Sequence, residues 1–255
     1  MKRWQIKLAA AAVSAICITA IFAIAREICW QQAVQDQQDE LAAFNLRLLE
    51  RAELVTAGAA DAMRLISQTP VDLCSTSHIE TMLRITVNNR FVDGLGYISD
   101  GTLRCTSWGP VRREIRVPDP DFYTRDGIGV VQSMKPKVAA TDARVVMYLD
   151  KYDALINPER FVDVFSDVAT SLAVASDSGI VVAAQNSPDA TLVRSLLARP
   201  HAGLNSDYVY NALSENGWTV VSMRSRASIS IRHNEALILP VAMIAALAIA
   251  GVASP

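Results

Sequence analysis

The sequence lacks the residue patterns of the common catalytic centres. Its three histidines, His78, His201 and His233, are far apart and show no metal-ligand spacing to one another or to a cysteine. No G-x-S-x-G, no phosphate-binding G-x-x-x-x-G-K-S/T loop and no H-E-x-x-H occurs. The sequence therefore predicts no catalytic residues, no metal site and no cofactor, and the chain is expected not to be an enzyme by itself.

Neither sign of charge is in large excess. The 24 lysines and arginines and the 26 acidic residues leave a formal net charge of −2, and no basic stripe of the kind that binds nucleic acid is present. One close pair of carboxylates, Asp119 and Asp121, flanks Pro120 in a proline-broken stretch, where both side chains are expected to be solvated. The balanced charge and the lack of a basic stripe argue against nucleic acid as a partner.

Two long apolar runs are present, and they bound the rest of the chain. Residues 8–25 and 236–253 carry no charge, and at about 1.5 Å per helical residue each run is long enough to cross a bilayer core. Because Lys2, Arg3 and Lys7 precede the first run, the positive-inside rule places the N-terminus in the cytoplasm. The sequence thus predicts a cytoplasmic segment 1–7, a membrane helix 8–25, a periplasmic domain 26–235, a second membrane helix 236–253 and a return to the cytoplasmic side at 254–255.

Each run has an alternative interpretation. Ala23-Ile24-Ala25 could be a signal-peptide cleavage site, but the first run is longer than the apolar core of a usual signal peptide, which favours an uncleaved anchor. The second run could be the buried last helix of a soluble domain, although such helices rarely extend this far without a charge. With two membrane helices and a cytoplasmic N-terminus, residues 26–235 are expected to lie on the outer side of the membrane.

Residues 30–67 predict a long helix that continues the first membrane helix and ends before Pro70. Apolar side chains at spacings of three and four lie on one of its faces: Leu41, Phe44, Leu48, Ala52, Val55, Ala59, Ala62 and Ile66. Packing on the domain's own sheet is the favoured use of this stripe. The alternative is that it also pairs with a second copy, and we expect a homodimer through the long helix and the membrane helices.

The remaining outer region predicts an α+β domain. Residues 77–87 are typical of a short helix capped by Ser75 or Ser77, and Asp100-Gly101 joins two strand-like runs as a hairpin. The polar, proline-interrupted stretch 111–127 is expected to be a surface loop. Further strands are expected at 129–133, 144–149, 171–175, 180–184 and 218–223, with short helices at 158–167 and 190–198. A long helix followed by an antiparallel sheet is similar to the PAS-like or Cache-like folds of extracytoplasmic sensors.

The four cysteines divide by location. Cys17 lies inside the first membrane helix, and Cys29 lies just outside it, where it is either an intermolecular thiol or a residue without a role. Cys74 and Cys105 lie in the outer domain, and two such thiols normally form a disulfide in an oxidising periplasm. Closing a loop of this length would stabilise the fold by about 3.7 kcal/mol in the chain-entropy treatment. This pair is the strongest candidate site.

Four short segments follow one another between the two apolar runs. They are Leu73-Cys74-Ser75, Gly94-Leu95-Gly96-Tyr97, Leu103-Arg104-Cys105-Thr106-Ser107 and Tyr152-Asp153-Ala154-Leu155-Ile156-Asn157-Pro158. In this order the chain resembles the CSS-motif sensor domains, the periplasmic N-terminal modules of bacterial membrane-bound cyclic-di-GMP phosphodiesterases. The motif itself aligns with Cys105-Thr106-Ser107, in which threonine replaces the middle serine and keeps a hydroxyl.

The resemblance implies a role in cyclic-di-GMP signalling and a location in a bacterial inner (cytoplasmic) membrane, with the main domain in the periplasm. In this family a cytoplasmic EAL phosphodiesterase domain follows the second anchor, but its metal-binding carboxylates and catalytic lysine have no counterparts in these residues. We interpret the chain as a redox-responsive periplasmic sensor that controls a phosphodiesterase domain missing here or supplied by a partner. Periplasmic thiol-disulfide oxidoreductases are expected to act on Cys74 and Cys105. The alternative is a receptor for a ligand or a protein, with a purely structural disulfide.

Overall fold

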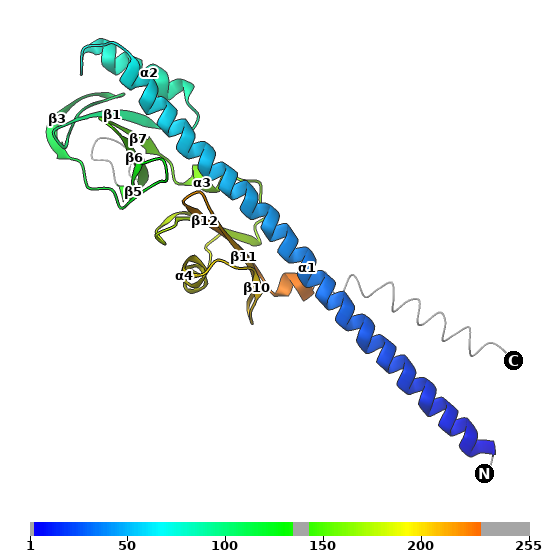
Figure 1. Cartoon of the computed structure of the whole chain (residues 1–255). Helices are drawn as coiled ribbons and strands as arrows, with labels where there is room; N and C mark the ends of the chain where they lie inside the picture. The colour runs from blue at the N-terminus through cyan, green and yellow to red at the C-terminus, as the bar shows by residue number, and fades with distance from the viewer. Residues whose placement is uncertain (1–2, 135–142, 231–255) are drawn as a thin grey trace. The chain divides into compact units, whose positions relative to one another are not determined.

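The computed structural model describes residues 3–134 and 143–230. Its first element is α1 (Arg3–Gln68), one continuous helix of 66 residues that contains the first apolar run (Figure 1). No proline occurs within it, so nothing in the sequence removes a helical hydrogen bond. Within these described ranges, α1 is the one helix long and apolar enough to span a membrane. The second predicted membrane helix, 236–253, lies outside the described residues.

Strands and short helices make up the remainder. In chain order they are α2 (Thr76–Asn88), β1 (Gly94–Ser99), β2 (Thr102–Thr106), β3 (Gly109–Arg116), β4 (Phe122–Tyr123), β5 (Gly129–Met134), β6 (Arg144–Leu149), β7 (Tyr152–Ile156), α3 (Glu159–Val162), β8 (Thr170–Ser176), β9 (Val181–Gln185), α4 (Ala190–Ala198), β10 (Gly203–Leu204), β11 (Tyr208–Glu215) and β12 (Trp218–Ser225). A seven-stranded sheet has the order β3-β2-β1-β7-β6-β5-β4, and a five-stranded sheet has the order β10-β11-β12-β8-β9. The pairs within them, such as β1 with β7 and β8 with β9, are antiparallel. The predicted α+β class, with a long N-terminal helix and antiparallel sheets, is confirmed.

The chain divides into two compact units. Among the described residues, one comprises 3–40, 203–209 and 224–230, and the other comprises 41–134, 143–202 and 210–223. In the first unit, the Arg224 guanidinium donates to Gln37 Oε1 (3.1 Å) and forms an ion pair with Glu40 (2.8 Å). The second unit contains the main hydrophobic core, the Cys74–Cys105 disulfide and the pocket next to α3.

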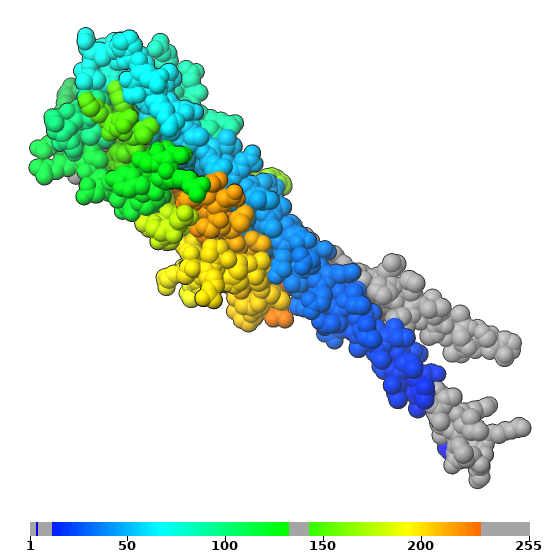
Figure 2. Space-filling view, in the orientation of Figure 1, coloured from blue at the N-terminus to red at the C-terminus, as the bar shows by residue number. Residues whose placement is uncertain are grey.

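The apolar stripe of α1 is buried in this second unit. Each of its side chains is at most 6% exposed: Leu41, Phe44, Leu48, Ala52, Val55, Ala59, Ala62 and Ile66. From Leu48 onward the stripe shares one core with α2 and with both sheets, through side chains that include Met82, Leu95, Met147, Leu172 and Trp218. The stripe therefore packs on the chain's own sheets, the favoured of the two alternatives. Another face of this part of α1 is exposed to solvent (blue to cyan in Figure 2), and the exposed side chains of α1 include Leu46, Leu54 and Leu65.

Helix α2 and the hairpin of β1 and β2 form where the sequence predicts them. Ser75 is the N-cap of α2, and its hydroxyl accepts a hydrogen bond from the His78 backbone N–H (3.2 Å). Asp100 and Gly101 have φ values of 54° and 67°, the two positive values that a tight type I′ hairpin turn requires. The resulting register sets Tyr97 opposite Cys105.

The prediction of a surface loop at 111–127 is wrong. This stretch contains most of β3 and all of β4, which form the two edges of the seven-stranded sheet. An edge strand leaves one row of backbone groups to solvent, so it tolerates the charges and the nearby prolines that suggested a loop. Strands β7, β10 and β11 are also absent from the sequence-based expectations, and the helix expected at 158–167 is a single turn, α3.

Gly96 is the point of closest approach inside the seven-stranded sheet. It pairs with Asp153 of β7, and a Cβ atom at Gly96 would overlap Asp153 Oδ1 and lie 2.7 Å from Leu103 Cδ1. We expect Gly96→Ala to lower the free energy of unfolding by about 3 kcal/mol, because overpacking displaces buried neighbours. Thermal and urea unfolding of the whole chain in detergent micelles measures this change.

Gly101→Ala is the matched control for this substitution. Nothing lies within 4 Å of the Cβ position at Gly101, so alanine there only has to adopt a positive φ, at a cost of about 1 kcal/mol. Equal losses of stability in the two variants would show that the close packing around Gly96 does not add to the cost of the substitution.

Candidate functional site

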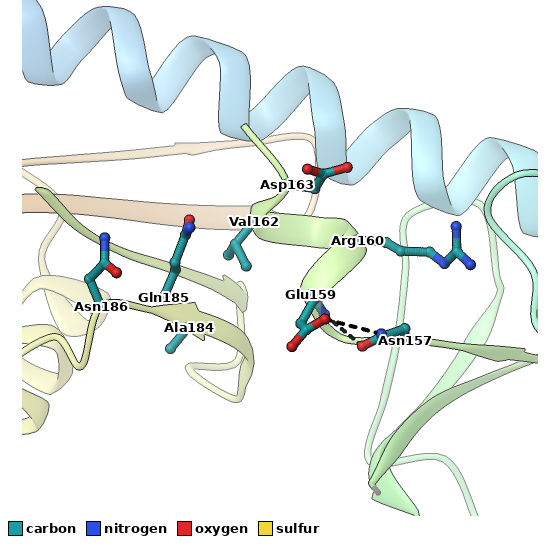
Figure 3. Close-up of a pocket in the computed structure, with 8 residues that line it drawn as sticks. All are labelled: Asn157, Glu159, Arg160, Val162, Asp163, Ala184, Gln185 and Asn186. Atoms are coloured by element: carbon teal, nitrogen blue, oxygen red, sulfur yellow. Dashed lines mark hydrogen bonds between the residues drawn. The ribbon is translucent and has the colours of Figure 1, made fainter. Parts of the chain in front are cut away.

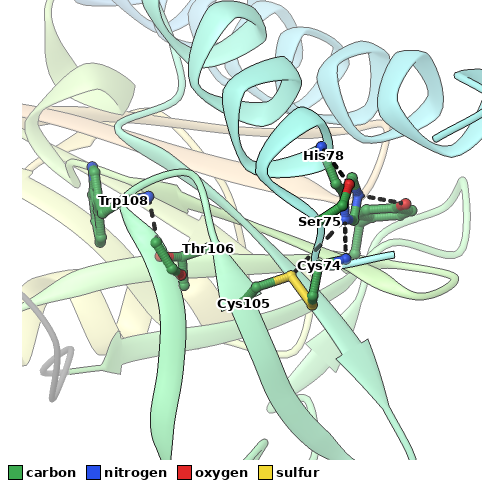
Figure 4. Close-up of a disulfide and its surroundings, with 8 residues drawn as sticks. Cys74, Ser75, His78, Cys105, Thr106 and Trp108 are labelled. Atoms are coloured by element: carbon green, nitrogen blue, oxygen red, sulfur yellow. Dashed lines mark hydrogen bonds between the residues drawn. A yellow bond between two sulfur atoms is a disulfide. The ribbon is translucent and has the colours of Figure 1, made fainter. Parts of the chain in front are cut away.

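Cys74 and Cys105 are joined by a disulfide next to the start of α2 (Figure 4). Their Sγ atoms are 2.08 Å apart and their Cα atoms 5.7 Å apart, as in ordinary protein disulfides. Cys105, on β2, is fully buried, whereas Cys74, in the loop between α1 and α2, is partly exposed. The bond therefore connects the beginning of α2 to an inner strand of the seven-stranded sheet.

His78 lies against this disulfide. Its side chain is fully buried, and its Nδ1 atom is 2.9 Å from the backbone nitrogen of Cys74 and 3.9 Å from Cys105 Sγ. Because the Cys74 N–H donates to Nδ1, the proton of the neutral ring is on Nε2, which donates to the Tyr152 hydroxyl at 3.2 Å. Burial lowers the pKa of His78 and so favours the neutral ring.

Tyr97 and Tyr152 complete the surroundings of the imidazole. The His78 ring centroid is 5.6 Å from that of Tyr97 and 5.9 Å from that of Tyr152, both in edge-on geometry. Burial, and secondarily the neighbouring Tyr97, raises the pKa of Tyr152, so its hydroxyl stays protonated and can accept the hydrogen bond from His78. The ring orientation of His78 is therefore fixed from two sides.

Sequence reasoning misses His78. It is 27 residues from Cys105, and only the packing of α2 on the sheet brings the two together. The one local signal is its position four residues after Cys74, since helical side chains lean back toward the N-terminus of their helix. Cys74, His78 and Cys105 form a group in which the potential ligand atoms all lie within 4.8 Å of one another.

The two hydroxyl residues that follow Cys105 hold the backbone. Ser107 N–H donates to the Leu95 carbonyl (2.7 Å), and Leu95 N–H donates to Ser107 Oγ (3.2 Å). Thr106 Oγ1 accepts from the Trp108 N–H (3.2 Å; Figure 4). Both hydroxyl residues are buried. The Cys-Thr-Ser segment thus consists of one disulfide sulfur and two hydroxyls that fix the end of β2 against β1 and at the turn into β3.

A second buried polar group, Asp153, lies beside Tyr152 on β7 and so points to the other face of the sheet. Asp153 is 5% exposed and lies opposite Tyr148 of β6 in the sheet. Among the described residues, neither Asp153 Oδ1 nor the Tyr148 hydroxyl has a hydrogen-bond partner. Burial raises the pKa of Asp153 to about 7, although the Gly96 N–H opposes this shift. Burial, together with the carboxylates of Asp153 and Asp121, also raises the pKa of Tyr148.

A pocket of about 520 Å³ lies next to α3 in the same unit (Figure 3). It is lined by Asn157, Glu159, Arg160, Val162, Asp163, Ala184, Gln185 and Asn186. Two of its charged residues are held by ion pairs, Arg160 with Asp93 (2.7 Å) and Asp163 with Arg51 (2.8 Å). The pocket therefore offers amides and charged groups to a small polar molecule.

The other candidates from the sequence lie apart from these groups. Cys17 and Cys29, both on α1, carry free thiols, and the intermolecular role of Cys29 stays a prediction. Asp119 and Asp121 are exposed, and Asp121 accepts a hydrogen bond from the Gln132 N–H (2.7 Å). These two carboxylates are thus solvated, as expected.

The sequence matches a known protein family over most of its length. Residues 37–237 match the family described as the CSS motif domain associated with EAL. The chain belongs to this family. The match includes the core part of α1, both sheets and the Cys105-Thr106-Ser107 segment, whose assignment as the CSS-like motif stays a prediction.

A curated relative of this CSS domain is a much longer protein. The probable cyclic di-GMP phosphodiesterase PdeB of Escherichia coli (strain K12) is 25% identical over 134 residues, which are 52% of this chain and 26% of PdeB. The matched part is thus about a quarter of that relative's length. The 255 residues contain the CSS domain, and the EAL catalytic domain is not among them.

One of the solved structures found to be similar to this chain shares its fold. The sensory domain of the Campylobacter jejuni chemoreceptor Tlp3 (CcmL) has a TM-score of 0.51 at 10% identity, with 82% of this chain and 99% of that domain covered. The ligand-binding domain of Mlp24 with asparagine (82% and 98% covered) and the periplasmic domain of RsbU from Chlamydia trachomatis (78% and 98%) have TM-scores of 0.39 and 0.36, both at 12% identity. The CSS domain therefore shares its fold with a bacterial sensory domain, and its apolar N-terminal helix fits a membrane anchor.

Proposed function

We propose that this chain is the periplasmic sensor part of a membrane-bound cyclic-di-GMP phosphodiesterase, and that the Cys74–Cys105 bond makes it responsive to redox conditions. The family's association with EAL and the similarity to an E. coli protein named as a probable cyclic di-GMP phosphodiesterase support the pathway. We also propose the topology expected from the sequence, with residues 26–235 in the periplasm between inner-membrane helices at 8–25 and 236–253. One observation carries the redox part: the bond fixes the beginning of α2 to the core.

The backbone at Cys74 supports a response to reduction. Its φ of 55° is a left-handed value that costs a non-glycine residue about 1 kcal/mol or more, and the bond to buried Cys105 holds it there. Reduction lets Cys74 return to an ordinary φ, which would move its N–H away from His78 and loosen Ser75 as the cap of α2. Because Gln68, the last residue of α1, is only six residues before Cys74, this change would reach the helix that enters the membrane.

A direct test begins with the coding DNA after codon 255. If an in-frame EAL domain follows, we expect the cyclic-di-GMP hydrolysis rate of the full-length protein in membranes to differ severalfold between its oxidised and reduced forms. Cys74→Ser should hold the rate at the reduced value, and a Cys17→Ala, Cys29→Ser double variant should respond like wild type. Redox control fails if oxidised wild type and Cys74→Ser hydrolyse at one rate and are cleaved alike in limited proteolysis.

Two partners follow from this proposal. A periplasmic thiol-disulfide oxidoreductase would set the redox state of the bond, and a second copy of the chain would carry the signal along α1. We expect oxidised membranes to contain a dimer linked through Cys29, visible on a non-reducing gel and absent in Cys29→Ser. Cys17→Ser is the control and should leave the dimer band unchanged; the dimer along α1 loses support if wild type gives no such band at any oxidant concentration.

The second candidate function is a receptor for a small ligand, with a structural disulfide. The pocket next to α3 favours it, because Gln185 lines this pocket and its buried Oε1 has no hydrogen-bond partner in the part of the chain that the structure describes. A thermal-shift screen of metabolites against the whole chain tests this function, since a ligand that binds only the native state raises the melting temperature. The shift should disappear in Gln185→Ala and persist in Gln132→Ala.

A further inference from the structure

Cys74, His78 and Cys105 together have the composition of a metal site. Thiolate sulfur and imidazole nitrogen are the donors that Zn²⁺ and other thiophilic cations prefer, and here the three potential donors lie within 4.8 Å of one another. We propose that reduction of the Cys74–Cys105 bond creates a three-ligand site for such a cation, with Zn²⁺ as the species that fits it. The inference rests on the proposed function only in that the bond must be reducible.

The distances suit a tetrahedral ion once the bond is open. With Zn–S of about 2.3 Å and Zn–N of about 2.0 Å, tetrahedral angles hold a sulfur and a nitrogen about 3.5 Å apart and two sulfurs about 3.8 Å apart. Cys105 Sγ and His78 Nδ1 are already 3.9 Å apart. The two sulfurs, now 2.08 Å apart, must separate further, and repulsion between unbonded sulfurs produces this movement in any case.

The imidazole is prepared for this role by its hydrogen bonds. Nδ1, the nitrogen that faces the sulfurs, carries no proton, because it accepts the Cys74 N–H. Nε2–H is held by the Tyr152 hydroxyl (3.2 Å). Metal-binding histidines commonly donate their second ring N–H to such a partner, which fixes the tautomer and the ring plane. Tyr152 is therefore the positioning residue of the proposed site.

The Cys74 N–H competes with a cation for the Nδ1 lone pair, and reduction removes this competition. In the disulfide state the positive φ of Cys74 holds its N–H on the ring. When the bond opens, Cys74 can adopt a negative φ and its N–H can turn away. Since Cys74 is partly exposed while His78 and Cys105 are buried, water can supply the fourth ligand from the Cys74 side.

The chemistry balances with a dithiol as reductant. Two electrons and two protons pass from the dithiol to the Cys74–Cys105 bond, which gives two thiols on the protein and one disulfide on the reductant. Zn²⁺ then binds both sulfurs as thiolates and the neutral imidazole, and two protons are released to solvent. The site thus carries no net charge from the ion and its three protein ligands, which suits its buried position.

The test uses the whole chain in detergent micelles, with Cys17→Ala and Cys29→Ser in every sample so that no other thiol binds metal. A phosphine reduces the protein without adding competing thiols, and Co²⁺ serves as the spectroscopic probe. We expect the reduced protein to bind one Co²⁺ per chain with thiolate-to-metal absorption, and Zn²⁺ to displace it. The oxidised protein should show no such absorption.

Three variants assign the ligands. Tyr152→Phe keeps the ring and removes the hydroxyl, so it should weaken Zn²⁺ binding about 10-fold or more. His78→Ala should weaken it by more than about 100-fold, because a direct ligand matters more than its outer partner, and its melting curve when oxidised shows whether it folds. His201→Ala changes an exposed histidine and should have no effect.

The proposal is overturned if reduced protein binds no metal, or if binding is the same in the oxidised, Tyr152→Phe and wild-type reduced samples.

The same samples separate this inference from the proposed function. With a chelator present, reduction should still increase cleavage around residues 69–93 if the bond alone controls α2. A chelator-independent increase without any metal binding would refute the metal site and leave redox sensing intact. Metal binding to the reduced protein without any change in cleavage on reduction would support the site and refute redox sensing.

Discussion

Cys74→Ser is expected to lower the free energy of unfolding of the oxidised chain by about 3.7 kcal/mol, the chain-entropy value for this loop. The bond closes a segment with a sequence separation of 31 and so restricts the unfolded chain. For a domain of this size the melting temperature should fall by about 10 °C. Thermal unfolding of the whole chain in detergent micelles, with and without reductant, measures both quantities.

Three comparisons test the origin of that loss. Reduced wild type should match Cys74→Ser, and Cys105→Ala should lose a similar amount because it breaks the same bond. Cys29→Ser changes a free thiol on α1 and should leave the melting temperature unaltered. A Cys74→Ser protein as stable as oxidised wild type would show that the bond does not hold the native fold.

Asp153→Asn is expected to abolish a fall in stability that wild type shows between about pH 4 and pH 7. The pKa of Asp153 is raised from 3.8 to about 7 by burial. Within this window the folded chain holds the proton and the unfolded chain has lost it, so the free energy of unfolding decreases as pH rises. Three pKa units at about 1.4 kcal/mol each amount to a decrease of up to about 4 kcal/mol by pH 7, constant above it.

The pH profile of urea unfolding measures this contribution. Asparagine has the shape of the protonated carboxyl group and does not titrate, so the variant should exceed wild type in stability at pH 8 and equal it near pH 4. Asp119→Asn alters an exposed carboxylate and should follow the wild-type curve. Parallel curves for Asp153→Asn and wild type would mean that Asp153 is ionised throughout the window.

The sequence predicts those elements whose formation depends on residues close to one another in the chain. The three-and-four spacing and Pro70 define α1, and Asp100-Gly101 defines the hairpin, because each signal acts within a few residues of itself. Strand β7 gave no such signal. Its sequence contains Asp153, which looks like a surface residue, yet pairing with β1 on one side and β6 on the other buries it.

The residues of the candidate site likewise fall into those that the sequence predicts and those whose position depends on tertiary packing. Cys74 and Cys105 could be paired from the sequence because the other two cysteines lie within the first membrane helix or just outside it. His78 could not be placed beside them, since its position depends on how α2 packs against β1 and β2. The Thr106 and Ser107 hydroxyls were recognised as part of a motif, but their backbone partners, Trp108 and Leu95, follow from the turn into β3 and the pairing with β1.

The unequal burial of the two sulfur-bearing residues has a consequence for the direction of thiol exchange. An attacking thiolate must reach the sulfur with which it forms the new bond, and Cys74 is partly exposed while Cys105 is fully buried. The mixed disulfide therefore forms on Cys74, and Cys105 departs as the leaving thiolate next to His78. A dithiol protein that has lost its second, resolving cysteine would remain covalently attached to Cys74.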